Sequence, residues 1–223
     1  MLVKLTFSAL LLLVAYLLGS IPTGYTAARL LKGIDIREHG SGSIGATNVL
    51  RTLGKGPAAL VLLVDALKGI AAIALVYGYY SLPSTPLTPI SWKPWLIAGV
   101  GFAAIFGHSR SIFLNFTGGK SVATSLGILV AMSYPVALGT LGVFGVFLAV
   151  SRIVSLSSIA GAIAVNLLMI LLKQPLPYQL FAGVAGLYVI WRHRSNVQRL
   201  LAGTEPRLGE KVPQTEAVSS SAE

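Results

Sequence analysis

Residues 57–80 read PAALVLLVDALKGIAAIALVYGYY, and this stretch decides the fold class. An α-helix crosses the hydrocarbon core of a bilayer with about 20 predominantly apolar residues, so the stretch is long enough to span. Its only charged residues are Asp65 and Lys68. They are three positions apart, share one face of a helix and can pair there, because an unpaired charge inside a membrane is costly. We therefore expect a spanning helix with a structural ion pair.

The rest of the chain has the same character. Of its 223 residues, 54% are apolar and 11% are charged, and the mean hydropathy is +0.78, whereas a soluble domain carries about a quarter charged residues. Six further apolar stretches cover residues 2–20, 94–108, 121–134, 135–150, 156–172 and 177–191. The sequence predicts an all-α polytopic membrane helix bundle with about seven transmembrane helices. The range is five to seven, since several stretches are short and Pro135 could mark one long broken span.

Basic residues are distributed unevenly between the two sides of this bundle. In the seven-helix arrangement, thirteen of the 17 Lys and Arg residues fall on one side, and Lys4, Lys93 and Lys173 fall on the other. The thirteen lie in segments 21–56, 109–120, 151–155 and 192–211. Loops rich in Lys and Arg stay in the cytoplasm. We expect an N-terminus outside, a cytoplasmic C-terminus, and one cytoplasmic face that carries the functional loops.

Length and composition exclude several classes of protein. The chain has room for one membrane domain, residues 1–203, followed by residues 204–223, which are polar and predicted to form a disordered cytoplasmic tail. It has no cysteine, which excludes disulfides, zinc–thiolate sites and a cysteine nucleophile. The net charge of +10 is better explained by orientation in the bilayer than by nucleic acid. Anionic ligands stay open, and we expect no metal and no cofactor.

The first candidate site is the loop of residues 35–51, DIREHGSGSIGATNVLR. Its glycines free backbone N–H groups to face an anion, its hydroxyls add donors, and Arg51 can hold phosphate oxygens in bidentate fashion. The candidate residues are Gly40, Ser41, Gly42, Thr47, Asn48 and Arg51. The alternative is a flexible loop with helix-capping Ser and Asn residues. It is not a nucleotide-binding G-x-x-x-x-G-K-[ST] loop.

The second candidate site is Gly118-Gly119-Lys120, which precedes the fourth apolar stretch. Free amides at the start of a helix favour an anion, and Lys120 adds a positive charge. His108 ends the preceding stretch, where it can donate a hydrogen bond or act as a base. The alternatives are an interfacial capping histidine and a lysine that extends to the membrane surface.

Two further segments carry polar residues at the ends of apolar stretches. Ser157 and Ser158 enter the sixth stretch, and His193 and Asn196, which share a helical face, follow the seventh. All four are candidate substrate ligands. The basic residues beside them, Arg192, Arg194 and Arg199, are equally well explained as topological signals.

Taken in order, these motifs resemble the bacterial PlsY family of acyl-phosphate:glycerol-3-phosphate acyltransferases. The motifs are residues 19–24, 40–48 with Arg51, 107–108, 116–120, 152–158 and 192–199, and the resemblance spans residues 1 to about 205. It implies that Ser41 and Arg51 are the family's essential serine and arginine, and that Gly118-Gly119-Lys120 belongs to the glycerol-phosphate site. His193, Asn196 and Glu205 match the third family motif, in which the glutamate is structural. Ser43 departs from the asparagine that the family usually has there.

The resemblance implies transfer of a fatty acyl group from acyl phosphate to the sn-1 hydroxyl of glycerol 3-phosphate. The products are lysophosphatidic acid and phosphate, in the first acylation of phospholipid biosynthesis in the bacterial inner membrane. The partners are then the two substrates and the lipid bilayer, with no nucleic acid. We expect catalytic roles for Ser41, Arg51, His108 and Lys120. Direct attack by the acceptor hydroxyl is favoured over an acyl-enzyme, with His108 or a substrate phosphate as the base.

The competing hypothesis is a membrane transporter of an organic phosphate or another anion, which would also use cationic residues and interrupted helices. A transporter places its charges near the bilayer midplane, whereas here only Asp65 and Lys68 lie deep in a predicted span. The His-x-x-x-x-Asp motif of other glycerolipid acyltransferases is also absent, because Ile44, Phe113 and Gln198 stand five residues after the three histidines. The acyltransferase hypothesis is therefore favoured.

Overall fold

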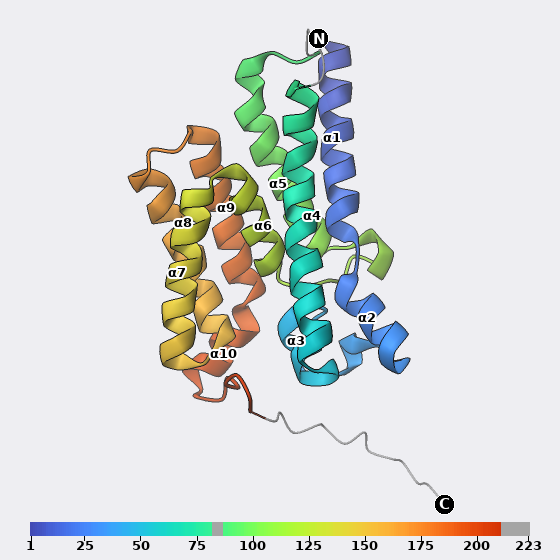
Figure 1. The fold of residues 1–223 in the computed structure, drawn as a ribbon, viewed down its shortest axis with the longest axis vertical. Coiled ribbons are helices and arrows are strands. Elements are labelled where there is room, and N and C mark those ends of the chain that lie inside the picture. The colour runs from blue at the N-terminus through green and yellow to red at the C-terminus, as the bar shows by residue number, and fades with distance from the viewer. Residues whose placement is uncertain (82–86, 211–223) are drawn as a thin grey trace, which may run out of the picture.

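A computed structural model describes residues 1–81 and 87–210, and these residues are built from helices (Figure 1). The long helices are α1 (Leu2–Ser20), α4 (Lys55–Ser81), α5 (Lys93–Ser109), α6 (Val122–Met132), α7 (Tyr134–Ser151), α8 (Val154–Leu171) and α9 (Leu176–Arg192). They correspond one to one to the seven apolar stretches of the sequence. The protein is an all-α polytopic membrane helix bundle.

Short helices occupy the connections between the long ones. They are α2 (Thr23–Lys32), α3 (Ala46–Leu53) and α10 (Arg194–Leu201), with the 3₁₀ turns η1 (Ile36–Glu38), η2 (Ile90–Trp92) and η3 (Ile112–Leu114). Five segments are long and apolar enough to cross a membrane: Leu2–Lys32, Lys55–Ser81, Ile90–Ser109, Tyr134–Ser151 and Val154–Leu171. That number lies within the predicted range of five to seven, and the number of crossings stays a prediction.

The stretch around Pro135 folds as two helices, not as one long span. Ser133 has an extended backbone (φ −159°), which ends α6, and Pro135 lies in the first turn of α7, where its missing N–H costs no hydrogen bond. The chain reverses there, so that α6 and α7 pack against each other as neighbours (Figure 1). With 11 residues, α6 is the shortest of the long helices.

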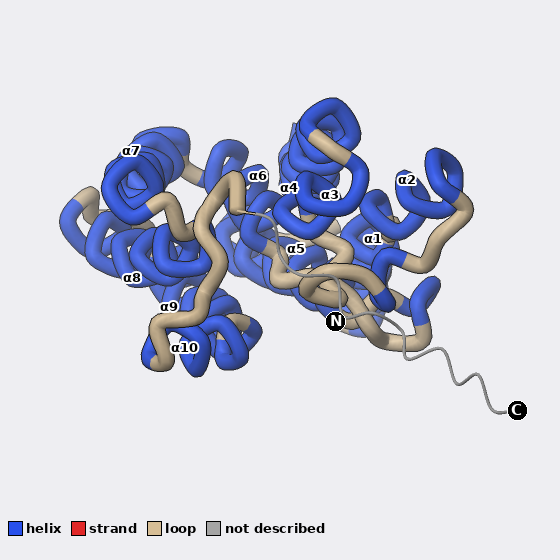
Figure 2. Tube along the Cα trace, turned by 90° about the horizontal axis from the view of Figure 1, so that it is seen from below, coloured by secondary structure: helices blue, strands red, loops and turns tan. Residues whose placement is uncertain are grey.

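The long helices form two groups, which are joined by α6 and by the packing of α5 against α9. Helices α1, α4 and α5 pack together, α7, α8 and α9 pack together, and α6 contacts both α4 and α7 (Figures 1 and 2). Glycine allows α4 and α6 to cross closely: a methyl group on Gly69 of α4 would collide with the Thr124 carbonyl, and one on Gly127 of α6 would collide with the Ala66 carbonyl. Small residues of this kind let helix backbones approach closely in a membrane.

The predicted ion pair inside α4 is present. Lys68 Nζ lies 2.8 Å from Asp65 Oδ1, and both side chains are buried. Lys68 also donates to the Ile21 carbonyl (3.0 Å), and the Thr23 hydroxyl donates to Asp65 (3.1 Å). Both bonds come from the break between α1 and α2, where Pro22 ends the helix. The pair therefore satisfies the polar groups that this break exposes within the bundle.

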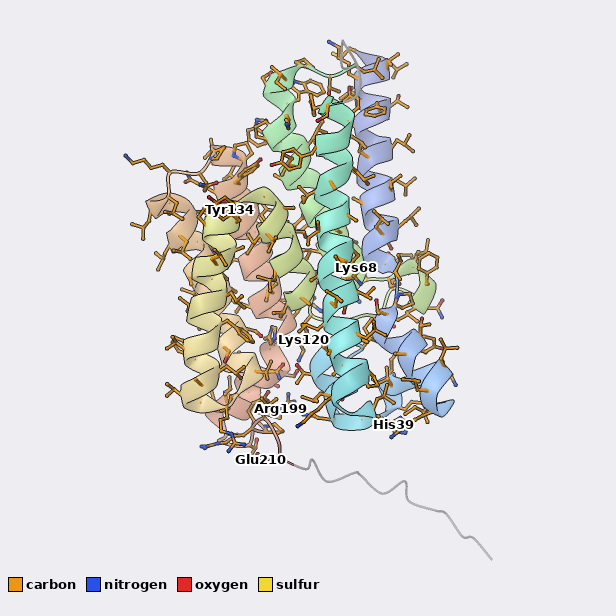
Figure 3. The ribbon with its side chains drawn as sticks, viewed as in Figure 1. His39, Lys68, Lys120, Tyr134, Arg199 and Glu210 are labelled. Carbon is orange, nitrogen blue, oxygen red and sulfur yellow. The ribbon has the colours of Figure 1, made fainter. Side chains whose placement is uncertain are left out.

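Residues 204–210, which the sequence analysis assigned to a tail, lie against the bundle. Glu205 is buried, and the backbone of Leu208 exchanges hydrogen bonds with Arg152, the residue after α7: Leu208 N–H donates to the Arg152 carbonyl (2.6 Å), and Arg152 Nη2 donates to the Leu208 carbonyl (3.0 Å). Residues 211–223 of the predicted tail lie outside the described residues. His39, Arg199 and Glu210 lie at the end of the bundle opposite the N-terminus (Figure 3).

Candidate active site

A cavity of about 530 Å³ lies between the two groups of helices. Polar and charged residues surround its mouth: Ser41, Ser43, Thr47, Asn48, Arg51, Lys55, Asp65, His108, Lys120, Ser121, Ser155, Ser158, His193, Asn196 and Glu205. Its inner part is a chamber lined mainly by apolar side chains of α6, α7, α8 and α9. Leu62 of α4 and Leu141 of α7 also line it and are 52% and 45% exposed, so the cavity opens toward lipid between these helices.

The loop before α3 is wrapped around the side chain of Asn48. The Asn48 Oδ1 atom accepts a hydrogen bond from the Ser41 backbone N–H (2.9 Å), and Nδ2 donates to the carbonyls of His39 and Ser43 (2.9 Å each). Gly40 has a positive φ of 59°, and a methyl group there would collide with Asn48 Oδ1. Glycine is therefore needed for this turn. The folding of this loop around Asn48 places Ser41 at the cavity wall.

Arg51 lies on α3 one turn after Asn48 and lines the same cavity. Its guanidinium is half-buried, and burial lowers the pKa of the group. Within residues 1–81 and 87–210, Arg51 forms no ion pair with a carboxylate. A partly desolvated cation without a carboxylate partner is a favourable position for the phosphate group of a ligand.

Lys120 begins a chain of hydrogen bonds that ties three segments together. Its Nζ donates to Asn196 Oδ1 (2.5 Å), and Asn196 Nδ2 donates to Glu205 Oε1 (2.6 Å). The Ser155 hydroxyl donates to the same glutamate oxygen (2.7 Å), and Arg199 Nε donates to Oε2 (2.7 Å). Glu205 thus holds α8, α10 and the segment after α10 around the ammonium group, as a structural residue would.

Two titratable groups at the mouth have strongly lowered pKa values. Burial lowers the pKa of Lys120 to about 8, and nearby arginines add to the shift. Burial lowers the pKa of His193 to about 4, so its ring is neutral at neutral pH. The His193 Nδ1 atom lies 2.8 Å from the Val189 carbonyl, which fixes the proton on Nδ1 and leaves Nε2 as an acceptor.

The Gly118-Gly119 turn is held from two sides. Arg192 of α9 donates from Nη2 to the carbonyls of Gly118 (3.0 Å) and Gly119 (2.9 Å). On the other side, the Gly119 N–H donates to the His108 carbonyl (3.1 Å), and a methyl group on Gly119 would collide with His108 Nε2. The His108 ring is buried, and its Nδ1 lies 3.6 Å from Asp65 Oδ1. His108 therefore supports the turn from inside the bundle.

Ser121 turns the chain from Lys120 into α6. It has a positive φ of 63°, which is unusual for a residue with a side chain. The strained conformation is held by the hydroxyl, which lies 2.7 Å from Ser109 Oγ and 2.9 Å from the Ile105 carbonyl. Ser121 thereby fixes the direction in which Lys120 leaves the turn.

A second cavity of about 260 Å³ adjoins the first and is predominantly polar. It is lined by Ser41, Gly42, Ser43, Gly118, Lys120, Arg192, Arg194, Ser195 and Gln198. Ser41, Ser43 and Lys120 line both cavities. A ligand in the polar cavity and a ligand in the larger one would therefore meet at these three residues. Lys120 lies within the helix bundle (Figure 3).

Residues 9–203 match the family model of glycerol-3-phosphate acyltransferase. The chain belongs to this acyltransferase family. Among its relatives, the glycerol-3-phosphate acyltransferase of Nostoc sp. is 64% identical over 93% of this chain and 95% of the relative. That of Crocosphaera subtropica is 60% identical over 93% of this chain and 96% of the relative.

Solved structures of PlsY, an integral membrane glycerol 3-phosphate acyltransferase, share the fold of this acyltransferase. The glycerol 3-phosphate form of PlsY superposes with a TM-score of 0.82 at 39% identity, covering 91% of this chain and 96% of PlsY. The lysophosphatidic acid form superposes with a TM-score of 0.78, covering 90% of this chain and 94% of PlsY. The resemblance found in the sequence motifs is confirmed at the level of family and fold.

The acyltransferase brings most of the predicted site residues to the two cavities. Those that line at least one of them are Ser41, Gly42, Thr47, Asn48, Arg51, His108, Gly118, Lys120, Ser158, His193 and Asn196. Gly40 and Gly119 lie behind the wall and shape it. Ser157 is buried on another face of α8, where its hydroxyl donates to the Ile153 carbonyl (2.9 Å).

Sequence reasoning missed Ser155 and Ser121, and it left Arg192 open between a role in the site and a role as a topological signal. Ser155 had a usable signal, because it shares a helical face with Ser158 (i, i+3), whereas Ser157 does not. The sequence could not decide the role of Arg192, since a basic residue at the end of a span is common. The role of Ser121 depends on its positive φ, which residue type does not reveal.

Proposed function

We propose that this acyltransferase transfers a fatty acyl group from acyl phosphate to the sn-1 hydroxyl of glycerol 3-phosphate. The products are lysophosphatidic acid and phosphate, and the reaction is the first acylation of phospholipid biosynthesis. The proposed location is the bacterial inner membrane, with the cavity mouth facing the cytoplasm. The monomer carries all the residues that this proposal uses.

One observation carries the proposal: a cationic mouth leads directly into an apolar chamber in the same cavity. Acyl phosphate has the matching chemistry, with a charged head on a long hydrocarbon chain. The adjoining polar cavity, with Arg192 and Arg194, suits a small water-soluble phosphate such as glycerol 3-phosphate. PlsY, a relative of known structure, has glycerol 3-phosphate and lysophosphatidic acid forms.

The proposed reaction needs no acyl-enzyme. The sn-1 hydroxyl oxygen attacks the acyl carbonyl carbon, the bond from that carbon to the phosphate oxygen breaks, and phosphate leaves with the electron pair. Arg51 and Lys120 stabilise the charge that develops on the departing phosphate. Acyl phosphate is already activated, so positioning of the two reactants supplies much of the acceleration.

The hydroxyl proton passes to a substrate phosphate oxygen in this proposal. His108 is the other candidate base from the sequence. However, its Nε2 lies against Gly119 and its Nδ1 faces Asp65, so neither nitrogen is directed toward an incoming hydroxyl. The lowered pKa of His193 also makes that ring a weak base. A phosphate oxygen at the reacting carbon is the remaining acceptor.

The test uses purified protein in detergent with labelled glycerol 3-phosphate and either acyl phosphate or acyl-CoA. We expect lysophosphatidic acid from acyl phosphate only. Arg51→Ala and Lys120→Ala should each lower kcat/KM by about 100-fold or more, while Lys173→Ala, on the opposite side of the bundle, should leave it unchanged. Product from acyl-CoA alone would overturn the donor, and a stoichiometrically acylated protein would overturn direct attack.

A further inference from the structure

At the end farthest from the mouth, the inner chamber of the large cavity is closed by one layer of lining side chains with packed core behind it. On each of four helices the cavity lining stops at one residue: Leu129 of α6, Thr140 of α7, Val165 of α8 and Phe181 of α9. One turn further along the same faces lie Met132, Val136, Met169 and Tyr178, which are at most 7% exposed and belong to the main hydrophobic core. The chamber therefore ends against solid packing.

The depth of this chamber matches one membrane leaflet. Val165 lies ten residues beyond Ser155 on α8, and at 1.5 Å per residue this is about 15 Å. Ser155 marks the level of the mouth, because it is joined through Glu205 and Asn196 to Lys120. The acyl chain of a membrane lipid also spans about 15 Å, half of the hydrocarbon core. A long-chain acyl group with the partly folded conformation that it has in a lipid leaflet would fill the chamber from mouth to end.

The width of the chamber depends on Gly161. This glycine lines the cavity two turns above Ser155 and one turn below Val165. A methyl group on Gly161 would meet Thr140 Cγ2 at 3.6 Å, the Thr140 carbonyl oxygen at 3.9 Å and Phe144 Cβ at 4.0 Å, which are ordinary contacts. A larger side chain at this position would reach toward Thr140 and Phe144, which also line the cavity, and would narrow the chamber there.

We propose that this chamber measures the acyl chain of the donor: the Leu129, Thr140, Val165 and Phe181 layer sets the upper length limit, and Gly161 keeps the path to that layer open. The proposal rests on the acyl transfer proposed above. An acyl chain longer than the chamber meets packed core, and a chain that is too short leaves apolar wall uncovered. Each methylene in such a pocket changes kcat/KM by about tenfold or more.

The test measures kcat/KM for a series of donors, from octanoyl through lauroyl, myristoyl, palmitoyl and stearoyl to arachidoyl phosphate. In wild type we expect an optimum among the long chains and a fall of about tenfold or more beyond it. Gly161→Leu should shift the preference toward octanoyl and lauroyl, raising the lauroyl-to-palmitoyl ratio by at least about tenfold. Gly161→Ala should shift it in the same direction by less.

The matched control is Gly145→Leu on α7. Gly145 does not line the cavity, and a side chain there has no atom within 4 Å to displace. It introduces the same leucine into the neighbouring helix, so its length profile should equal that of wild type. Phe181→Leu tests the end of the chamber, because a shorter side chain there should move the optimum to longer chains. It is milder than Phe181→Ala, since the Phe181 ring packs against Gly101 of α5.

The outcomes separate this inference from the function on which it rests. Lack of product from every donor in wild type would contradict the acyl transfer itself. Product from every donor with the same length profile in wild type, Gly161→Leu and Phe181→Leu would retain acyl transfer and overturn the length measurement. That result would mean that the chain leaves the cavity sideways between α4 and α7.

Discussion

Lys120 is the residue on which the two cavities depend most directly. It lines both of them, and its ammonium group is partly buried among Arg51, Arg192 and Arg199, with only Glu205 opposing their repulsion. A lysine in this environment loses its proton near pH 8 when no substrate is bound. A phosphate ligand needs the charged form, so binding of phosphate and protonation of Lys120 are linked.

This linkage predicts a pH dependence of substrate binding. The charged fraction of Lys120 falls as pH rises through about 8, so the KM for glycerol 3-phosphate should rise by up to about tenfold per pH unit above that value. Lys120→Arg stays charged over this range, and its KM should remain level to about pH 10. Initial rates across the pH range check this, with Lys173→Arg as control. Parallel profiles in wild type and Lys120→Arg would contradict it.

For single residues, the sequence predicted which side chains reach the site better than it predicted what each side chain does there. Ser41, Arg51, Lys120 and His193 were predicted from residue type and reach the cavity, because anion sites need donors and cations. Asn48 was predicted to bind substrate, yet both ends of its amide are engaged with the backbone of its own loop. Residue type shows that an amide can donate and accept, but only the fold shows to which groups.

The turn between α5 and α6 illustrates how elements cooperate in this site. It carries Gly118, Gly119 and Lys120. Its shape is held by Arg192 from the end of α9 and by His108 from the end of α5. Two helices that are distant in sequence therefore determine where one ammonium group points.

This arrangement predicts the behaviour of Arg192→Lys. Lysine keeps the positive charge but lacks the planar fork that bridges the two glycine carbonyls. We expect kcat/KM for glycerol 3-phosphate to fall by about 10- to 100-fold, because the turn loses its fixed position. The melting temperature should change little. Kinetics and thermal unfolding of this variant check the prediction, with the exposed Arg207→Lys as control. Unchanged kinetics would show that the turn holds without Arg192.

Helices were predicted correctly where the length of an apolar stretch is enough to identify them. The seven apolar stretches all appear as helices because a buried backbone in a membrane must satisfy its own hydrogen bonds. The short helices α2, α3 and α10 were not anticipated. They are amphipathic and eight to ten residues long, so they depend on packing against the bundle more than on their own sequence. They also carry much of the site, since Arg51 and Asn196 lie on them.

The whole molecule has a charge asymmetry that predicts its orientation. Lys173 lies in the exposed turn between α8 and α9, whereas Arg207 lies beyond α10 at the basic end. Since the chain has no cysteine, a single introduced thiol reports its position without background. In intact spheroplasts, a membrane-impermeant maleimide should label Lys173→Cys, and it should label Arg207→Cys only after permeabilisation. The reverse pattern would invert the proposed topology.

The assembly of the bundle was less accessible from sequence than its elements. Hydropathy located the helices, but the contact of α6 with both helix groups follows from the reversal at Ser133 and from the glycine crossings with α4. The cavity lies between these groups, and residues of α4, α6, α7, α8 and α9 line it. No local sequence pattern shows how far apart two helices lie, and the apolar chamber was therefore not predicted.

Leu62 and Leu141 leave one side of the large cavity facing lipid, whereas the adjoining cavity is polar. The two proposed reactants then reach the same site from different phases, the donor from the membrane and the acceptor from solution. The donor arrives by lateral diffusion in a sheet, and its effective concentration is a mole fraction among lipids. The acceptor arrives from a volume and is counted in moles per litre. Inert lipid would lower the mole fraction of the donor and leave the concentration of the acceptor unchanged, so the rate of this enzyme would depend on membrane composition.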